Sequence, residues 1–190
     1  LPGKMIQSTF QDNTAQSEAA IISNLSSVAP FRLAYLSEPL AAPVRISGTP
    51  SVDLSAIVDQ SDTDFGAALV DFGPPKTRVS RSSEGVVSAN PSVANGDAWT
   101  DDACYIETVK TLSTVDTWRV ARGGVDGLNL FDYAAPTPLV PGETYEFSFD
   151  LYPTDYTFDA GHQIAVVIVS SYPQLLCSGT APACNAPNTN

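Results

Sequence analysis

The sequence has few basic residues and a single histidine. Nine Lys and Arg stand against 21 Asp and Glu in 190 residues, which gives a formal net charge of −12. A chain with this charge repels phosphate backbones rather than releasing their counterions, so nucleic acid is excluded as a partner class. The acidity is typical of a solubilised outer surface.

Two further absences argue against a self-sufficient serine hydrolase. No Gly-x-Ser-x-Gly sequence occurs, although the serine nucleophile of an α/β-hydrolase sits on such a turn. His162 is the only histidine, so it would have to be the general base of any Ser-His site. Because it stands at the start of the most apolar run, we expect it to pack or to bond a turn. We therefore predict no catalytic residue in this chain.

Long apolar runs and metal-ligand spacings are also missing. No stretch of about 18 uninterrupted apolar residues occurs, so the sequence predicts no membrane span. Leu1 is not followed by the basic and apolar regions of a signal peptide, which favours a mature product or an excised fragment. Three cysteines and one remote histidine show no zinc-ligand spacing, and we expect no cofactor.

What the sequence does contain is typical of one all-β domain. With 43% hydrophobic residues, 15 prolines and 12 glycines, short apolar runs alternate with turn signals, as in sandwiches and barrels. Charged residues make up 16%, below the roughly 25% of an average domain, while uncharged polar residues are plentiful. This balance favours an exported, secreted protein.

The chain divides into three predicted parts. Residues 1–30 form an arm or linker, residues 31–176 the β-sandwich domain, and residues 177–190 a tail, disordered after Cys184. Residues 83–103 are expected to form a long loop. The expected strands are 31–37, 43–48, 51–59, 65–73, 77–82, 104–112, 116–122, 144–152 and 163–171.

Residues 141–173 carry the clearest pattern. Side chains alternate between apolar and polar from Tyr145 to Leu151, the period-two signature of a half-buried strand. The run from Ile164 to Val169 is apolar on both faces, as expected of a central strand. A polar bend over residues 154–161 separates the two runs, and together they predict a β-hairpin.

Four segments, read in order, resemble the C-terminal domain of the Xaa-Pro dipeptidyl-peptidase and cocaine-esterase-like serine hydrolases. They are LAYLSEPLAAPVRISGTP (33–50), ALVDFGP (68–74), WRVARG (118–123) and PGETYEFSFDLYPTDYTFDAGHQI (141–164). The resemblance implies a jelly-roll β-sandwich of the galactose-binding-like type. The motif positions to which it assigns a structural role are Pro141, Gly142, Gly161, His162, Arg122 and Gly123.

The resemblance also implies a partner. In this family a Ser-Asp-His triad on a separate α/β-hydrolase domain performs the catalysis, so the expected partner is an upstream α/β-hydrolase domain of the same polypeptide. The parent reaction would be acyl transfer from a peptide whose second residue is proline to a serine, and then to water. Residues 101–123 look more like the peptidase branch than the esterase branch.

The cysteines predict one disulfide. Cys177 and Cys184 flank Gly179 and Pro182, which allow the chain to double back and bring the sulfurs into bonding range. Cys104 resembles a cysteine that secreted members of the family carry after an acidic turn, but the accompanying upstream cysteine is missing. We expect Cys104 to be a buried free thiol.

Two other groups of side chains offer ligand chemistry. Asp59, Asp62 and Asp64 place three carboxylates in one loop, a source of oxygen ligands for calcium. Aspartates between strands more often bond their own backbone, so we favour a turn and no metal. Core packing is likewise favoured over sugar stacking for the aromatic residues, which are Trp99, Tyr105, Trp118, Tyr133 and Tyr152.

The N-terminal segment carries more apolar side chains than an irregular stretch should bury by itself. We expect it to help form an exposed patch that docks on the hydrolase domain. The alternative is a free-standing carbohydrate- or calcium-binding jelly-roll module, whose N-terminal apolar side chains would lie inside the sandwich. The side chains concerned are Met5, Ile6, Phe10, Ile21, Ile22, Leu25, Val28, Phe31 and Leu33.

Overall fold

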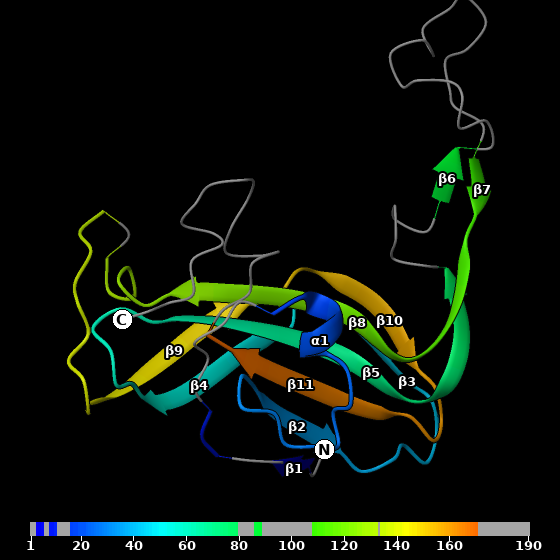
Figure 1. The fold of residues 1–190 in the computed structure, drawn as a ribbon, viewed down its shortest axis with the longest axis horizontal. Coiled ribbons are helices and arrows are strands. Elements are labelled where there is room, and N and C mark those ends of the chain that lie inside the picture. The colour runs from blue at the N-terminus through cyan, green and yellow to red at the C-terminus, as the bar shows by residue number, and fades with distance from the viewer. Residues whose placement is uncertain are drawn as a thin grey trace, which may run out of the picture. The chain divides into compact units, whose positions relative to one another are not determined.

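The chain folds as an antiparallel β-sandwich with one very short helix, as seen in a computed structural model (Figure 1). The structure describes residues 3–5, 8–10, 16–79, 86–88, 108–132 and 134–170. The elements are β1 (Gly3–Met5), α1 (Glu18–Ile21), β2 (Leu33–Ser37), β3 (Val44–Gly48), β4 (Ser51–Ile57), β5 (Asp64–Val79), β6 (Val86–Ser88), β7 (Thr108–Lys110), β8 (Leu112–Asp126), β9 (Thr144–Asp150), β10 (Thr154–Phe158) and β11 (Gln163–Val169).

The strands pair in a nested order. β2 pairs with β11, β3 with β10 and β4 with β9, all antiparallel, and β5 neighbours β8. One sheet has the order β1-β2-β11-β5-β8, and Figure 1 shows β11 running between β2 and β5. The pairs β10-β3 and β4-β9 form the facing layer. The prediction that residues 164–169 form a central strand is therefore confirmed.

The main core lies between these layers. One side of β2, β11, β5 and β8 faces it, including Phe65 and Leu69 of β5 and Ile168 of β11. From the facing layer come Phe147 and Phe158, both almost completely buried. The Phe65 and Phe147 rings meet edge to face, with centroids 4.7 Å apart. Strict alternation in β9 follows, because its other side faces solvent.

A second core covers the opposite side of the same sheet. Ala165, Val167 and Val169 of β11 point into it, together with side chains from β2 and β5. The helix and the turn after it supply the cover, because Ile21, Ile22 and Leu25 are buried in this cluster. This cover explains why the run 164–169 is apolar on both faces.

The expectation that the N-terminal apolar side chains would remain open is wrong for most of those described. Ile21, Ile22, Leu25 and Leu33 are buried in the domain's own cores, and Phe10 packs partly buried against the main one. Val28 alone among the nine is a large exposed hydrophobic in the described residues. The side chains of Met5 and Ile6 lie outside the described residues.

Arg32 fixes the helix to the sheet. Its side chain is buried, and its guanidinium donates hydrogen bonds to the carbonyl oxygens of Ala20 (3.1 Å), Ile21 and Asn24 (2.9 Å). The Ala20 and Ile21 carbonyls belong to the last turn of the helix, whose carbonyl oxygens have no partner inside the helix, and Asn24 lies in the turn that follows. At the other end, the Ser17 hydroxyl accepts the Ala20 N–H.

The predicted hairpin between residues 145–151 and 164–169 is wrong. β9 pairs with β4, whereas β11 pairs with β2 and β5 in the opposite layer. The segment expected to be a polar bend contains β10, which pairs with β3. Alternation correctly predicted two strands, but sequence adjacency did not determine their partners.

Residues 75–116 form a second compact unit. Within it, β6 and β7 pair antiparallel, with Val87 opposite Val109. The Thr77 and Thr114 hydroxyls are 2.9 Å apart and share a hydrogen bond. No helix among the described residues is long and apolar enough to cross a membrane.

Candidate functional site

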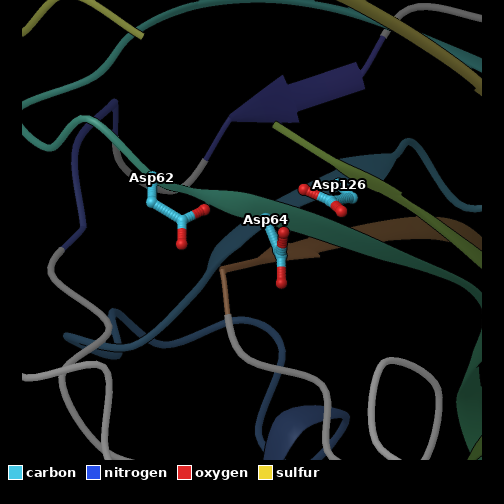
Figure 2. Close-up of side chains that lie close together, drawn as sticks. All are labelled: Asp62, Asp64 and Asp126. Atoms are coloured by element: carbon cyan, nitrogen blue, oxygen red, sulfur yellow. The ribbon is translucent and has the colours of Figure 1, made fainter. Parts of the chain in front are cut away.

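Three carboxylates meet where β5 begins and β8 ends. Asp62 precedes β5, Asp64 is its first residue and Asp126 is the last residue of β8. One oxygen from each lies within 4.8 Å of the others. In the view of Figure 2 the Asp64 carboxylate lies between the other two. We call Asp62, Asp64 and Asp126 the carboxylate cluster.

The turn after β8 holds Asp126 in place. Its two carboxylate oxygens accept hydrogen bonds from the Leu128 N–H at 2.9 Å and the Asn129 side-chain amide at 2.5 Å. Asp64 accepts a hydrogen bond from the Gly127 backbone and shares one with Asp126. Asp126 therefore forms the turn after β8, whereas the turn role expected for Asp59, Asp62 and Asp64 in the loop before β5 stays a prediction.

Burial, followed by the nearby charges of Asp126 and Asp62, raises the pKa of Asp64 to about 6. The hydrogen bond from Gly127 opposes this shift. Burial, followed by the charge of Asp126, also raises the pKa of Asp62.

The cluster brings together two of the three residues considered for calcium. Asp59 is exposed and does not belong to it among the described residues. Asp126 was missed because it is distant in sequence, and only the adjacency of β5 and β8 brings it near. Three side chains fall short of the six to eight oxygens that calcium takes. Calcium binding in this loop stays an untested alternative to a turn.

The raised pKa predicts that Asp64 weakens the fold as pH rises. Asp64 binds its proton more tightly when folded, so its stabilising contribution is complete below its unfolded pKa near 4. The contribution is lost as pH rises through about 6. We expect Asp64→Asn to gain about 1 kcal/mol of unfolding free energy over wild type between pH 4 and pH 7, after solvent screening. Urea unfolding at a series of pH values measures this difference.

Asp59→Asn is the matched control for that measurement. Asp59 lies in the same loop but outside the cluster, so its substitution should leave the pH dependence close to that of wild type. A gap between wild type and Asp64→Asn that stays constant from pH 4 to pH 7 would contradict the assignment to Asp64.

His162 belongs to a polar network with Asp71 and Tyr156. Its Nδ1 lies 2.6 Å from Oδ1 of Asp71, and the Tyr156 hydroxyl donates to Oδ2 of Asp71 at 2.6 Å. Asp71 and His162 are both buried. Within the described residues no hydrogen bond joins the imidazole to a Ser, Thr or Cys side chain. The geometry gives His162 a positioning role in this network.

The turns of the motif use glycine for its backbone conformation. Gly161 has φ +80° and Gly142 has φ +89°, and both lie in turns. Gly161 and His162 exchange backbone hydrogen bonds with Leu40, each 2.8 Å long. After Pro141, the Gly142 N–H donates to the Val58 carbonyl at 2.8 Å. These contacts tie the β10–β11 and β8–β9 connections to neighbouring loops.

Arg122 and Gly123 connect β8 to two other parts of the fold. The Arg122 guanidinium donates to the Glu18 carboxylate at 3.1 Å, and Arg119 bonds the same oxygen. All three side chains are largely buried. The Arg122 carbonyl accepts the Tyr152 N–H at 2.8 Å, so this motif holds both the helix and the end of β9.

The remaining site predictions are only partly covered by the structure. Trp118 is half-buried, whereas Tyr152 is 58% exposed and does not belong to the core. Trp99, Tyr105 and Tyr133 lie outside the described residues, as do the three cysteines, Cys104, Cys177 and Cys184. The described part of the set therefore brings no group of aromatic rings together as a sugar platform.

Residues 5–189 match the family model described as the X-Pro dipeptidyl-peptidase C-terminal non-catalytic domain. The chain belongs to this family. In this X-Pro dipeptidyl-peptidase C-terminal domain, the only histidine of the sequence, His162, hydrogen-bonds with Asp71, which also accepts a hydrogen bond from Tyr156. The resemblance inferred from the four sequence segments is confirmed.

Curated relatives of this family domain are much longer. A provisionally named Xaa-Pro dipeptidyl-peptidase of Streptomyces avermitilis is 29% identical over 170 residues, covering 88% of this chain and 25% of the relative. The Xaa-Pro dipeptidyl-peptidase of Lacticaseibacillus casei is 28% identical over 157 residues, covering 83% and 19%. The domain thus spans a quarter or less of these relatives.

Solved structures show the same fold. An α-amino acid ester hydrolase aligns with a TM-score of 0.52 at 21% identity, covering 86% of this chain and 24% of that one. An aminopeptidase from a marine sediment archaeon, Thaumarchaeota archaeon, aligns with a TM-score of 0.51 at 23% identity, covering 83% and 23%. At these identities the likeness concerns the fold alone.

Proposed function

We propose that this domain is the C-terminal part of an exported Xaa-Pro dipeptidyl-peptidase. In the parent protein it packs on an upstream α/β-hydrolase domain and completes it, without contributing a catalytic residue. The observation that carries this proposal is family membership together with coverage of only 19–25% of the named peptidases. The parent reaction would transfer the acyl group of a peptide with proline at its second position to a serine, and then to water.

We assign the fold, within the sandwich class, to the jelly rolls of galactose-binding type. The nested pairing supports this assignment, because β2 pairs with β11, β3 with β10 and β4 with β9, around the neighbours β5 and β8. A jelly roll folds a long hairpin over itself in two sheets, and nested antiparallel pairs are its consequence.

The 190-residue chain alone should not hydrolyse Gly-Pro-p-nitroanilide or simple esters. It has no Gly-x-Ser-x-Gly turn, and the His162 ring is committed to Asp71. The polypeptide that includes the upstream domain should release nitroaniline under the same conditions. Turnover by the chain alone that disappears in His162→Ala and is blocked by a serine-directed phosphonate would overturn the non-catalytic role.

The proposed export rests on the polar, charge-poor composition and on the cysteine tail. We expect one free thiol in denatured, unreduced protein, because Cys177 and Cys184 form a disulfide and Cys104 stays reduced. Closing a loop of about eight residues would remove about 2.5 kcal/mol of unfolded-state entropy. Three free thiols would rule out the disulfide. If the one free thiol is Cys177 or Cys184, then Cys104 forms a disulfide with the other cysteine of that pair.

The alternative function is a free-standing binding module, and the carboxylate cluster is the observation that favours calcium as its ligand. Under our proposal, millimolar calcium should leave the midpoint of thermal unfolding unchanged in wild type and in Asp64→Asn. A calcium-dependent rise in wild type that Asp64→Asn removes would favour the alternative.

A further inference from the structure

Exposed apolar side chains gather at one end of the sandwich, around Tyr145. The Tyr145 hydroxyl accepts the Val140 N–H at 2.8 Å, and the Phe131 ring lies 6.2 Å from the Tyr145 ring between centroids. Phe131 is 64% exposed, and Val140 is also exposed. We call Phe131, Val140 and Tyr145 the end patch.

The other large exposed hydrophobics of the described residues do not gather in this way. They are Val28, Ile57, Leu112 and Tyr152, and they come from different parts of the chain. Ile57 lies on the solvent side of β4, opposite the side on which Ala56 and Tyr145 pack against the core. Single exposed apolar side chains are normal on protein surfaces. A group around one tyrosine is less common, and aromatic residues are enriched where proteins contact one another.

The backbone beneath the end patch is held in place. The connection from β8 to β9 spans residues 127–143, longer than the usual connection in a compact domain. Backbone hydrogen bonds nevertheless fix it at several points: Thr137 N–H to Leu128, Leu139 N–H to Ser61, and Gly142 N–H to Val58, each 2.7–2.8 Å. A surface that is ordered before binding loses less entropy when a partner covers it.

We propose that the end patch is the surface on which the upstream α/β-hydrolase domain of the same polypeptide docks. This inference rests on the proposed function, and it names the face that the domain uses. The named relatives carry three quarters or more of their length outside the matched region, so they have the chain to cover it. Contacts between domains of one chain typically bury about 600–1,500 Å², more than one side chain can supply.

The charges around the end patch indicate which side chains the partner's docking surface should carry. Asp59 and Asp132 are exposed in the two connections that form this end of the sandwich, and Asp62 is exposed beside them. A complementary surface therefore has an apolar centre that receives Phe131 and Val140, with Lys or Arg at its rim. A second copy of this chain, with its net charge of −12, presents few such basic groups.

Cysteine labelling in the full-length polypeptide tests the assignment. Phe131→Cys and Val140→Cys place a reporter in the end patch, and Tyr152→Cys places one at an equally exposed position elsewhere on the sandwich. All three sit on exposed side chains, and the wild-type protein supplies the background from the native cysteines. We expect maleimide to label positions 131 and 140 at least tenfold more slowly than position 152 in the full-length polypeptide. In the 190-residue chain the three rates should be similar.

Each other outcome overturns the proposal. Equal labelling at positions 131, 140 and 152 of a full-length polypeptide that hydrolyses Gly-Pro-p-nitroanilide would reject this face but leave the proposed function standing. Protection that appears in the 190-residue chain as its concentration rises, together with dimers in sedimentation, would assign the patch to self-association. A full-length polypeptide without an α/β-hydrolase domain would reject both the face and the proposed function.

Discussion

Asp71→Ala is expected to lower the free energy of unfolding by about 3–5 kcal/mol, a large fraction of what a domain of this size has. The substitution removes a carboxylate that is 1% exposed and that bonds both His162 and Tyr156. The buried His162 ring would lose its Asp71 partner, and an unsatisfied buried polar group costs about 1–3 kcal/mol. The half-buried Tyr156 hydroxyl would lose the same acceptor. Urea unfolding of the purified chain measures the loss.

Asp155→Ala is the matched control, because it removes a carboxylate from an exposed ion pair. The Asp155 carboxylate accepts two hydrogen bonds from Arg45, at 2.8 and 2.5 Å, but both side chains are more than half exposed. Exposed pairs contribute little, so we expect a much smaller loss of unfolding free energy than for Asp71→Ala. Equal losses from the two substitutions would contradict the structural role of the buried network.

A double-mutant cycle separates the Asp71–His162 contact from the rest of the network. If the two side chains act together, the loss in Asp71→Ala plus His162→Ala should be smaller than the sum of the single losses by about 1–3 kcal/mol. Additive losses would mean that the 2.6 Å contact contributes nothing of its own.

Gly123→Ala is expected to be strongly destabilising, although it adds only a single methyl group. A Cβ at this position would lie 2.1 Å from the Asp150 carbonyl oxygen and 2.9 Å from the Leu151 Cα. Both are backbone atoms, so relief requires β8 and the end of β9 to move apart. We expect a loss of about 3 kcal/mol or more in unfolding free energy, at or above the upper range for overpacked sites.

Gly142→Ala distinguishes this steric effect from the ordinary cost of replacing glycine. Gly142 has φ +89°, but a Cβ there would meet no atom within 4 Å. The expected loss is about 1–2 kcal/mol, the cost of a left-handed backbone conformation in an alanine. Gly123→Ala unfolding at the same urea concentration as Gly142→Ala would show that the close approach to Asp150 is not tight in solution.

Much of the strand content could be predicted because alternation and apolar runs are local properties of the chain. The expected strands at 31–37, 43–48 and 51–59 correspond to β2, β3 and β4. Pairing is not local, which is why residues 145–151 and 164–169 read as a hairpin although they lie in different layers. β10 was missed because its polar side chains suit a bend as well as an edge strand.

The polar contacts also separate into a part that the sequence predicts and a part that it does not. The resemblance pointed to Arg122 and His162, but it did not identify the side chains that they bind. Glu18 is more than a hundred positions from Arg122, and Asp71 is 91 from His162. Asp126 joins Asp64 only because β5 and β8 are neighbours. The sequence does not identify these contact partners, because they come together only through the order of the strands in the sheet.

The position of β11 has a consequence for synthesis on the ribosome. β11 is the last strand described, yet it lies between β2 and β5 and bonds both. Until residues 163–169 have emerged, the nascent chain holds two apolar strands whose backbone groups lack their common neighbour. Such open edges invite pairing with other chains. The domain should therefore fold in one late step, and a nascent chain stalled before this strand should depend on chaperones to stay soluble.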